Sequence, residues 1–355
     1  MSRRTALSRG NGAATSYGYS QASRLTSLAH NLEGATTTND ANWAFSYNVA
    51  GQVTSRSLVQ VYETTTTSLN QSYVPNGLNQ YASVGGASFT HDARGNLIRD
   101  ASRSFCYDLE NRLTGVAVAA AVNCASPTGS LTYDPLGRLH SYTTGGATTE
   151  FLYDGDRLVG EFAPGQLTTP LRRYAHGPGV DEPLIWYEGS ATNAGQNWLI
   201  ADRQGSIIAT TSASGIATTY AYDPYGIPRE WAGPRFRYTG QAALPELQLY
   251  HYKARVYDPG IGRFLQTDPV GYEENLNLYM YTLDDPINAF DPNGAETIFI
   301  GGAGDRGAYK QDFVRALGDA GIGNVRGSPT ISMGGSLPGG LALQSNGTLV
   351  GFGGG

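Results

Sequence analysis

The sequence predicts a mainly β fold made of antiparallel hairpins, and three observations support this prediction. Gly accounts for 47 of the 355 residues and Tyr for 23, while only 15% of the residues are charged. This composition favours strands joined by tight turns. A short motif recurs along the chain, as in repeat architectures. Its copies are separated by Thr, Ser, Val and Tyr runs with partial alternation, such as residues 141–151 and 207–222, which suit half-buried strands.

The recurring unit is an aromatic residue, Asp or Asn, two further residues, Gly or Asn, a basic or polar residue, and an aliphatic one. Each copy is expected to form a hairpin turn in which Asp accepts a backbone hydrogen bond from two residues on and Gly or Asn adopts a positive φ. A single hairpin is not stable alone, so the copies should stack edge to edge into one sheet. The copies begin at Tyr47, His91, Tyr107, Tyr133, Tyr222 and, in shortened form, Tyr153.

Charge and composition argue against several classes of function. The formal net charge is −6, and no Lys or Arg run is long enough to attract nucleic acid. The basic first nine residues lead into Gly, Asn and Ser, so no signal peptide is expected, and no apolar stretch is long enough to predict a membrane span. The five histidines are scattered, so no metal site is expected. No cofactor is expected either.

The two cysteines leave two alternatives open. Cys106 and Cys124 flank residues 109–122, a stretch that could fold back as a hairpin, so a disulfide between them is geometrically conceivable. The favoured alternative is a pair of buried reduced thiols, because a free Cys packs as a small hydrophobic residue. Two cysteines alone decide nothing about the cellular compartment.

Several longer segments carry a resemblance to a known family. They are FCYDLENRLT from Phe105, YAHGPGVDEPL from Tyr174, LIADRQGSI from Leu199, YDPYG from Tyr222, and RYTGQ with LYHYKARVYDPGIGRFLQTDPVG in residues 237–271. Over residues 17–295 the chain resembles bacterial Rhs and other YD-repeat proteins, including the C components of insecticidal toxin complexes and the teneurins. The resemblance is greatest to the Rhs repeat-associated core.

The resemblance implies strands that spiral into a hollow cocoon around a variable, often toxic C-terminal polypeptide. Known full shells use many more repeats, so this chain is expected to form only an open section of wall. It is expected to divide into a YD-repeat shell (1–235), a repeat-associated core with a self-cleavage motif (236–295) and a variable segment, interpreted as a truncated effector (296–355). The implied partners are the enclosed C-terminal segment, an immunity protein and a secretion-system component, with delivery to the bacterial surface or exterior by a specialised route.

The resemblance also points to two Asp-Pro motifs where the repeats end. In Rhs proteins the chain is cut after a motif similar to the second one, by an intramolecular reaction that resembles aspartic protease chemistry. Such chemistry needs one ionised carboxylate to activate water and one protonated carboxyl to polarise the carbonyl, and close placement separates their pKa values. Carried over to this sequence, the pattern implies Asp268 and Asp291 as the catalytic pair and a cut between Ala295 and Glu296.

Other residues of the motif support or qualify this assignment. Pro286, Pro292 and Gly294 match the family motif, whereas Ala295 stands where the family usually has Leu. A smaller side chain at that position could seat the scissile bond poorly and slow the cut. Tethering the peptide to its catalyst would supply the proximity that a separate protease obtains by binding.

Two arginines precede the first aspartate, and an alternative interpretation exists for each charged group. Arg263 and Arg255 could hold one carboxylate ionised, or could be solvated strand charges and shell salt bridges. The aspartates of the pair could equally be ordinary turn residues, as Asp258 is expected to be. Asp284 and Asp285 are interpreted as caps of the turn before Pro286.

The residue pattern of the sequence changes after Ala295. Residues 296–300 are expected to form a strand, 301–304 a glycine turn, and 307–318 a helix capped by Asp305. Gly302, Gly304 and Gly307 spell G-x-G-x-x-G, but no acidic residue follows as a dinucleotide fingerprint requires. The start of a truncated α/β toxin domain is favoured over nucleotide binding or an inert remnant. Residues 334–338 lack the last Gly of a nucleophile elbow, and residues 328–355 are Gly- and Ser-rich.

Three functions follow as hypotheses. The favoured one is a carrier shell that encloses and releases a C-terminal toxin in competition between bacteria, with self-cleavage as its only chemistry. An adhesive or structural surface protein predicts an uncleaved chain. A tail with hydrolase or nucleotide-binding activity of its own predicts ligand binding by the isolated tail.

Overall fold

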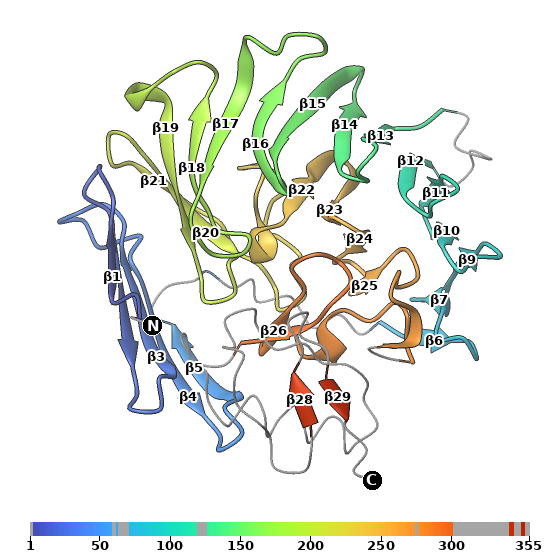
Figure 1. Ribbon diagram of the computed structural model, residues 1–355, viewed down its shortest axis with the longest axis horizontal. Coiled ribbons are helices and arrows are strands. Elements are labelled where there is room, and N and C mark those ends of the chain that lie inside the picture. Colours follow the sequence, from blue (N-terminus) through green and yellow to red (C-terminus); the bar gives the residue numbers. More distant parts are fainter. Residues whose placement is uncertain are drawn as a thin grey trace.

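The strands of the computed structural model form a curved wall around a smaller set of C-terminal strands (Figure 1). The structure describes residues 3–58, 62, 71–118, 126–273 and 276–300, together with two short strands at 341–343 and 349–351. Every strand pairing given for these residues is antiparallel. The predicted mainly β fold of antiparallel hairpins is therefore confirmed.

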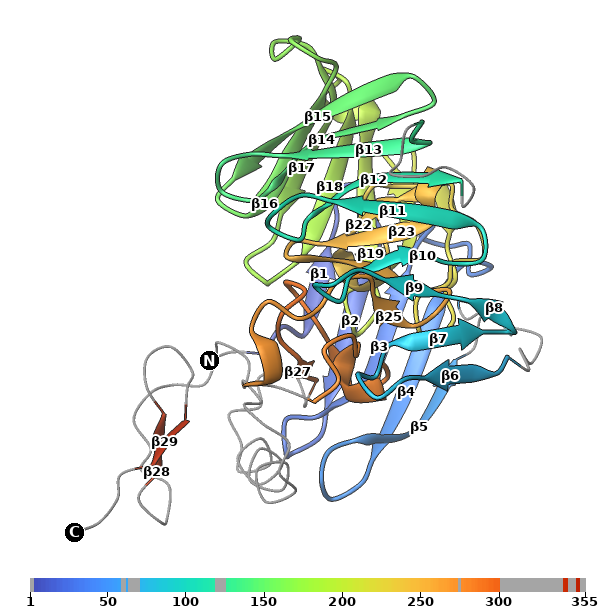
Figure 2. The same cartoon turned by 90° about the vertical axis from the view of Figure 1, so that its right-hand side faces the viewer.

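Thirteen described strands form the largest sheet, and each pairs with its neighbours in chain order. They run side by side in Figure 2. The strands are β9 (Thr90–His91), β10 (Leu97–Arg99), β11 (Arg103–Tyr107), β12 (Leu113–Val118), β13 (Gly129–Tyr133), β14 (Leu139–Thr144), β15 (Ala147–Asp154), β16 (Arg157–Phe162), β17 (Pro170–His176), β18 (Pro183–Glu188), β19 (Gln196–Ala201), β20 (Ile207–Ser212) and β21 (Ala217–Thr219).

Two further sheets precede this one in the sequence. Five strands form the first: β1 (Ala6–Ser8), β2 (Ala14–Tyr19), β3 (Leu25–Asn31), β4 (Ala41–Tyr47) and β5 (Val53–Leu58). Three strands form the second: β6 (Tyr73–Pro75), β7 (Tyr81–Val84) and β8 (Ala87–Ser88).

The inner sheet, which follows the wall in the sequence, lies inside the arc of the wall (Figure 1). It contains β22 (Ala242–Leu244), β23 (Leu249–Tyr252), β24 (Arg255–Asp258) and β25 (Arg263–Phe264). Two pairs follow, β26 (Ala289–Phe290) with β27 (Ile298–Phe299), and β28 (Leu341–Leu343) with β29 (Leu349–Gly351). Single 3₁₀ turns are η2 (Asn193–Gly195), η3 (Tyr238–Gly240), η4 (Pro245–Leu247), η5 (Gly271–Glu273) and η6 (Thr282–Asp284). Among the described residues, no helix is long and apolar enough to cross a membrane.

The turn at Asp134 shows how the repeat makes a hairpin. Its Oδ1 accepts the backbone N–H groups of Leu136 at 2.9 Å and Arg138 at 3.0 Å. Gly137 adopts a φ of 81° and donates its N–H to the Asp134 carbonyl. Arg138 Nε returns to Asp134 Oδ2 at 2.7 Å. The same pair of backbone hydrogen bonds is accepted by Asp92, Asp108, Asp202 and Asp223. The predicted aspartate turn with a positive φ is confirmed for the copies that begin at His91, Tyr107, Tyr133 and Tyr222.

The tyrosine of a repeat binds the repeat before it. The Tyr133 hydroxyl donates to the carbonyl of Leu113 at 2.8 Å, and a β-bulge at Tyr133 shifts the strand register there. The Arg112 guanidinium lies 4.9 Å from the centroid of the same ring, a cation–π distance. The corresponding hydroxyl-to-carbonyl pairs are Tyr47 with Leu25, Tyr107 with Leu97, Tyr153 with Leu139 and Tyr222 with Ile207, and the His176 ring contacts the Leu158 carbonyl instead. Adjacent repeats are thereby held in register.

One hydrophobic cluster joins the wall to the inner sheet. It contains Leu113 and Leu139 from the wall and Tyr250 and Tyr257 from the inner sheet, all buried. The expected boundary between residues 235 and 236 therefore crosses a continuous core. A second cluster joins the five-stranded sheet to β19 and β20.

Cys106 on β11 is disulfide-bonded, so the favoured expectation of reduced thiols was wrong for this residue. The only other cysteine in the sequence, Cys124, lies outside the described residues. The physical reason is that β11 and β12 form a hairpin with Cys106 opposite Gly115, and β12 also pairs with β13, so the strands on either side of Cys124 are neighbours in the sheet that holds Cys106.

Only some of the predictions for residues 296–355 fall on residues that the structure describes. A strand appears within residues 296–300 as β27, while the glycine turn, the helix at 307–318 and the G-x-G-x-x-G pattern lie outside the described residues. So do residues 334–338. Within the Gly- and Ser-rich stretch, the structure describes only the β28 and β29 pair.

We predict that Tyr133→Phe lowers the free energy of unfolding by about 1 kcal/mol, the usual value of one intramolecular hydrogen bond. The substitution removes only the hydroxyl that binds the Leu113 carbonyl. Urea unfolding followed by tyrosine fluorescence measures the change. Tyr73→Phe is the control, because Tyr73 is 44% exposed and its hydroxyl makes only a 3.4 Å contact with Gln71. Equal effects of the two substitutions would contradict the proposed coupling between repeats.

Candidate functional site

The two Asp-Pro motifs converge on one guanidinium, that of Arg255 on β24. Arg255 Nη2 lies 2.8 Å from Asp268 Oδ2 and 3.6 Å from Asp291 Oδ2. The side chains of Arg255 and Asp291 are each 3% exposed, and that of Asp268 is 11% exposed. Arg255 also donates to the carbonyls of Gly294 and Leu278. The structure thus brings the two sequence-predicted carboxylates together around a buried cation.

Asp291 organises the chain that follows it. Its Oδ1 accepts the N–H groups of Asn293 at 3.0 Å and Gly294 at 2.7 Å, and the Glu296 N–H also hydrogen-bonds to this carboxyl group. The Asn293 side chain accepts the Ala295 N–H at 3.1 Å and donates to Glu296 Oε1 at 3.0 Å. The peptide nitrogen that joins Ala295 to Glu296 is therefore in contact with Asp291.

Asp268 uses the same kind of turn as the repeats. Its Oδ1 accepts the Val270 N–H at 3.0 Å, and its carbonyl accepts the Gly271 N–H at 3.0 Å. The second carboxylate oxygen, which the repeat aspartate Asp134 directs to its own Arg138, here turns to Arg255. Both turns therefore direct an Oδ2 oxygen to the same guanidinium, that of Arg255.

Burial gives these two carboxyl groups a higher pKa than an ordinary aspartate has. Desolvation raises the pKa of Asp291 to about 6, because Arg255 and three backbone N–H groups offset its effect only in part. Desolvation also raises the pKa of Asp268, against Arg255 and the Val270 N–H. Asp268 is more exposed and closer to the guanidinium, so it is the more acidic of the two. Of the two, Asp291 is the group that keeps its proton to the higher pH.

The turn after Asp291 is held from its other side by donors of the inner sheet and the wall. Lys253 Nζ and Gln241 Nε2 both donate to the Pro292 carbonyl, and Lys253 also pairs with Asp181 at 2.6 Å. Sequence reasoning missed all three of these residues. All three lie in segments that carry the family resemblance, but those segments alone did not indicate this contact.

Gly294 lets this turn pack against β23 and β24. Its φ is 74°, and a Cβ atom there would lie 2.5 Å from the Tyr252 carbonyl oxygen and 2.9 Å from the Arg255 nitrogen. The Asn293 carbonyl meanwhile accepts the Ala254 N–H at 3.0 Å. The motif glycine is therefore required both by conformation and by space.

Arg263 lies outside this constellation. Its Nε donates to the Tyr81 hydroxyl at 3.0 Å, and its Nη1 lies 3.5 Å from Asp284. Arg255 takes the position next to the carboxylates because it faces the core from the middle of the inner sheet, whereas Arg263 lies on the edge strand β25. Pro286, the first residue of the motif, offers its carbonyl to Gln204 of the wall.

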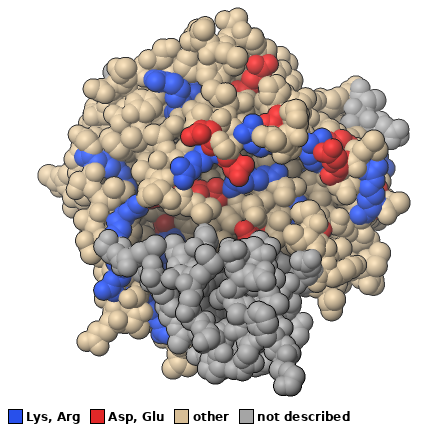
Figure 3. All heavy atoms as spheres, in the orientation of Figure 1, with Lys and Arg blue, Asp and Glu red and all other residues tan. Residues whose placement is uncertain are grey.

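A cavity of about 430 Å³ opens beside Asn293 and Ala295. Lys253, Arg138 and Asp156 are among the residues that line it. Figure 3 shows basic and acidic side chains gathered around a hollow in the centre of this face of the molecule. Within the part of the chain that the structure describes, no three His, Cys, Asp or Glu side chains are grouped as metal ligands.

Comparison with known proteins agrees with this architecture. The family model described as Teneurin YD-shell matches residues 3–287. The chain belongs to the Teneurin YD-shell family. Solved structures titled TcdB2-TccC3-TEV and Photorhabdus luminescens Tc holotoxin pore (with a TccC3 mutation) each share the fold at a TM-score of 0.57. Sequence identity is 16% and 17%, and each match covers 81% of this chain and 18% of that chain.

Curated relatives of this YD-shell chain include toxins. It is 27% identical over 268 residues to the tRNA3(Ser)-specific nuclease WapA of Bacillus spizizenii, covering 72% of this chain and 11% of the relative. It is 25% identical over 347 residues to double-stranded DNA deaminase toxin A of Burkholderia cenocepacia, covering 81% and 23%. A shorter match, 36% over 81 residues, is to toxin subunit YenC2 of Yersinia entomophaga, covering 21% and 8%. The chain therefore spans about a quarter or less of these relatives.

We predict that Gly294→Ala destabilises the protein by at least about 2 kcal/mol more than Gly271→Ala, since a backbone overlap adds to the strain of a positive φ. The two glycines have φ values of 74° and 69°, and nothing lies within 4 Å of a Cβ atom at Gly271. The control thus shares the turn conformation but not the clash. Thermal unfolding by calorimetry compares the two. Similar melting temperatures would contradict the close approach described for Gly294.

Proposed function

We propose that this chain is a wall segment of a bacterial Rhs-type toxin shell and that it cuts itself once, between Ala295 and Glu296. The observation that carries the proposal is the pair of buried aspartates that share the Arg255 guanidinium, one of which contacts the Glu296 nitrogen. The names of the relatives, which describe toxins and a toxin subunit, support the carrier role. An immunity protein and a secretion machine are the partners that such a role requires.

The proposed reaction assigns a different task to each carboxyl group. Asp268, held ionised by Arg255, accepts a proton from water as the hydroxyl adds to the Ala295 carbonyl carbon. Asp291, which holds a proton, gives it to the Glu296 nitrogen as the carbon–nitrogen bond breaks. The products are the Ala295 carboxyl group and the Glu296 amine. The tether supplies the effective concentration that a separate enzyme would gain by binding.

We predict that Asp268→Asn and Asp291→Asn each abolish the cut, because either change removes the acid or the base. Intact mass measured under denaturing conditions gives the result. The wild-type chain of 37.7 kDa should yield a second species of about 6 kDa, since residues 296–355 are 60 of 355. Asp284→Asn is the matched control, because Asp284 is 47% exposed and pairs only weakly with Arg263 among the contacts given.

The same mass measurement distinguishes self-cleavage from a non-cleaving role. A persistent full-length species in the wild type would favour a non-cleaving adhesive or structural role. Cleavage that continues in Asp291→Asn would exclude the two-carboxylate reaction while leaving the shell assignment intact.

We predict a bell-shaped dependence of the cleavage rate on pH. The acid Asp291 has a pKa of about 6, so its protonated fraction, and with it the rate, falls as pH rises through that value, approaching about tenfold per unit. On the acid side the rate falls when Asp268 protonates, above the ordinary aspartate range because its pKa is raised. The measurement starts from full-length chain isolated in urea and refolded by dilution at pH 4 to 8. A rate that stays constant or increases between pH 6 and 8 would contradict the assignment of Asp291 as the acid.

A further inference from the structure

We propose that the strand immediately after the cut remains part of the shell, so that cleavage and release are separate steps controlled by separate residues. The inference rests on the proposed cleavage between Ala295 and Glu296. The retained element, here called the latch strand, is residues 296–300. Its binding surface consists of β26 and the turn between β19 and β20.

The latch strand pairs with the chain on the other side of the cut. Ala289 lies opposite Phe299 and Phe290 opposite Ile298 in the antiparallel pair of β26 and β27. The pair is extended by the Ile300 N–H, which donates to the Asn288 carbonyl at 2.7 Å. None of these hydrogen bonds passes through the peptide bond that would be cut. Strand addition of this kind holds a peptide by its main chain, whether or not it is covalently attached.

Burial supports the same conclusion. Ile298 is 6% exposed and Thr297 8% exposed, which is typical of core residues and not of a loop prepared for release. The opposite strand is equally fixed, because Ala289 is fully buried and the Asn288 side chain accepts the Val53 N–H of β5 at 2.8 Å. The latch strand is therefore buried against a partner strand that is itself held in place.

The turn between β19 and β20 spans the proposed cut. Arg203 donates one end of its guanidinium to the Ile287 carbonyl, upstream of the cut, and the other to the Ile300 carbonyl at 3.4 Å, downstream of it. Gln204 donates to the carbonyls of Pro286 and Ala289. One side chain thus binds both products, and its neighbour fixes the upstream one.

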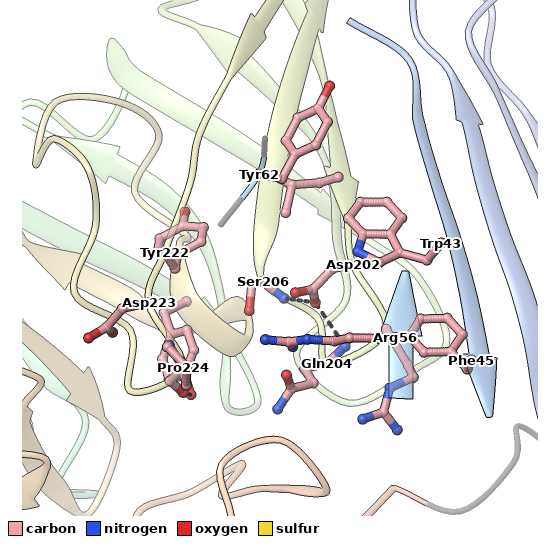
Figure 4. Close-up of a pocket in the computed structure, with 13 residues that line it drawn as sticks. Trp43, Phe45, Arg56, Tyr62, Asp202, Gln204, Ser206, Tyr222, Asp223 and Pro224 are labelled. Atoms are coloured by element: carbon pink, nitrogen blue, oxygen red, sulfur yellow. Dashed lines mark hydrogen bonds between the residues drawn. The ribbon is translucent and has the colours of Figure 1, made fainter. Parts of the chain in front are cut away.

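This turn is itself rigid. Figure 4 shows the Asp202 carboxylate receiving the N–H groups of Gln204 and Ser206, at 2.8 and 2.9 Å, while the Gln204 side chain points away from the sheet. The Arg203 guanidinium lies 5.5 Å from the Phe45 ring centroid, against β4 of the five-stranded sheet. A repeat turn of the wall therefore presents Arg203 in a fixed position to both sides of the cut.

The proposal predicts that the cleaved chain keeps its C-terminal product through the latch strand. The test uses the full chain after self-cleavage, with the fraction of residues 296–355 that stays with the shell measured by size exclusion at low and high salt. Ile300→Pro removes the N–H that binds Asn288, and a proline there leaves Phe299 free to stay extended. It should speed release about fivefold, as the loss of one hydrogen bond implies. Ile300→Val keeps the N–H and serves as its matched control.

A second pair of variants tests the bridge. Arg203→Met should also release the product faster, whereas Arg172→Met removes an arginine whose salt bridge with Glu188 lies at the surface and should not. Prompt separation of the two products in the wild type, or equal retention in every variant, would overturn the latch while leaving cleavage established.

Absence of any cut would count against the proposed function, and hydrogen exchange then decides the latch on the intact chain. The amides of residues 298–300 should be protected in the wild type and in Asp291→Asn, and should exchange at least about tenfold faster in Arg203→Met. Unprotected amides in the wild type would refute the latch by themselves.

Discussion

The structure depends on one local interaction, an aspartate side chain that accepts the backbone N–H groups of its own hairpin turn. In the wall this interaction reverses the chain at Asp92, Asp108, Asp134, Asp202 and Asp223. Beside Asp108, Asp134 and Asp223, the preceding tyrosine then binds a carbonyl of the repeat before it, as Tyr133 binds Leu113. A local turn preference is thereby converted into a continuous sheet, without a long-range signal in the sequence.

The candidate site is built from the same turn, and the difference lies in the second carboxylate oxygen. At Asp108 desolvation is outweighed by hydrogen bonds from Arg112, and the pKa falls. At Asp291 the turn is buried and no arginine follows four residues on; the pKa rises, because Arg255 is shared with Asp268 and offsets the desolvation only partly. The aspartate of such a turn therefore keeps its proton to a higher pH when its own arginine is replaced by one that it shares with a second carboxylate.

This difference also explains how much of the fold and of the site could be predicted from the sequence. The hairpin turns could be predicted because each is local, with its Asp and its glycine or asparagine within four residues. The carboxylate pair followed from a family resemblance, since 23 positions separate Asp268 from Asp291. The choice of Arg255 over Arg263 could not be made, because both precede Asp268 in strand-like sequence and only the packing of the inner sheet places one toward the core. Lys253, Gln241 and Arg203 act through backbone carbonyls, which leave no pattern in a sequence.

The residues around Asp268 and Asp291 come from only part of the chain. Asp181 and Arg203 come from the last hairpins of the thirteen-stranded sheet, and Lys253 and Arg255 from the inner sheet that follows directly. Contacts with the first sheet are made by Asn288, whose side chain accepts the Val53 N–H, and by Arg203, which lies over the Phe45 ring. The geometry around Asp268 and Asp291 therefore does not depend on a closed cocoon. The strands that the structure describes are sufficient to bring Asp268, Asp291 and Arg255 together.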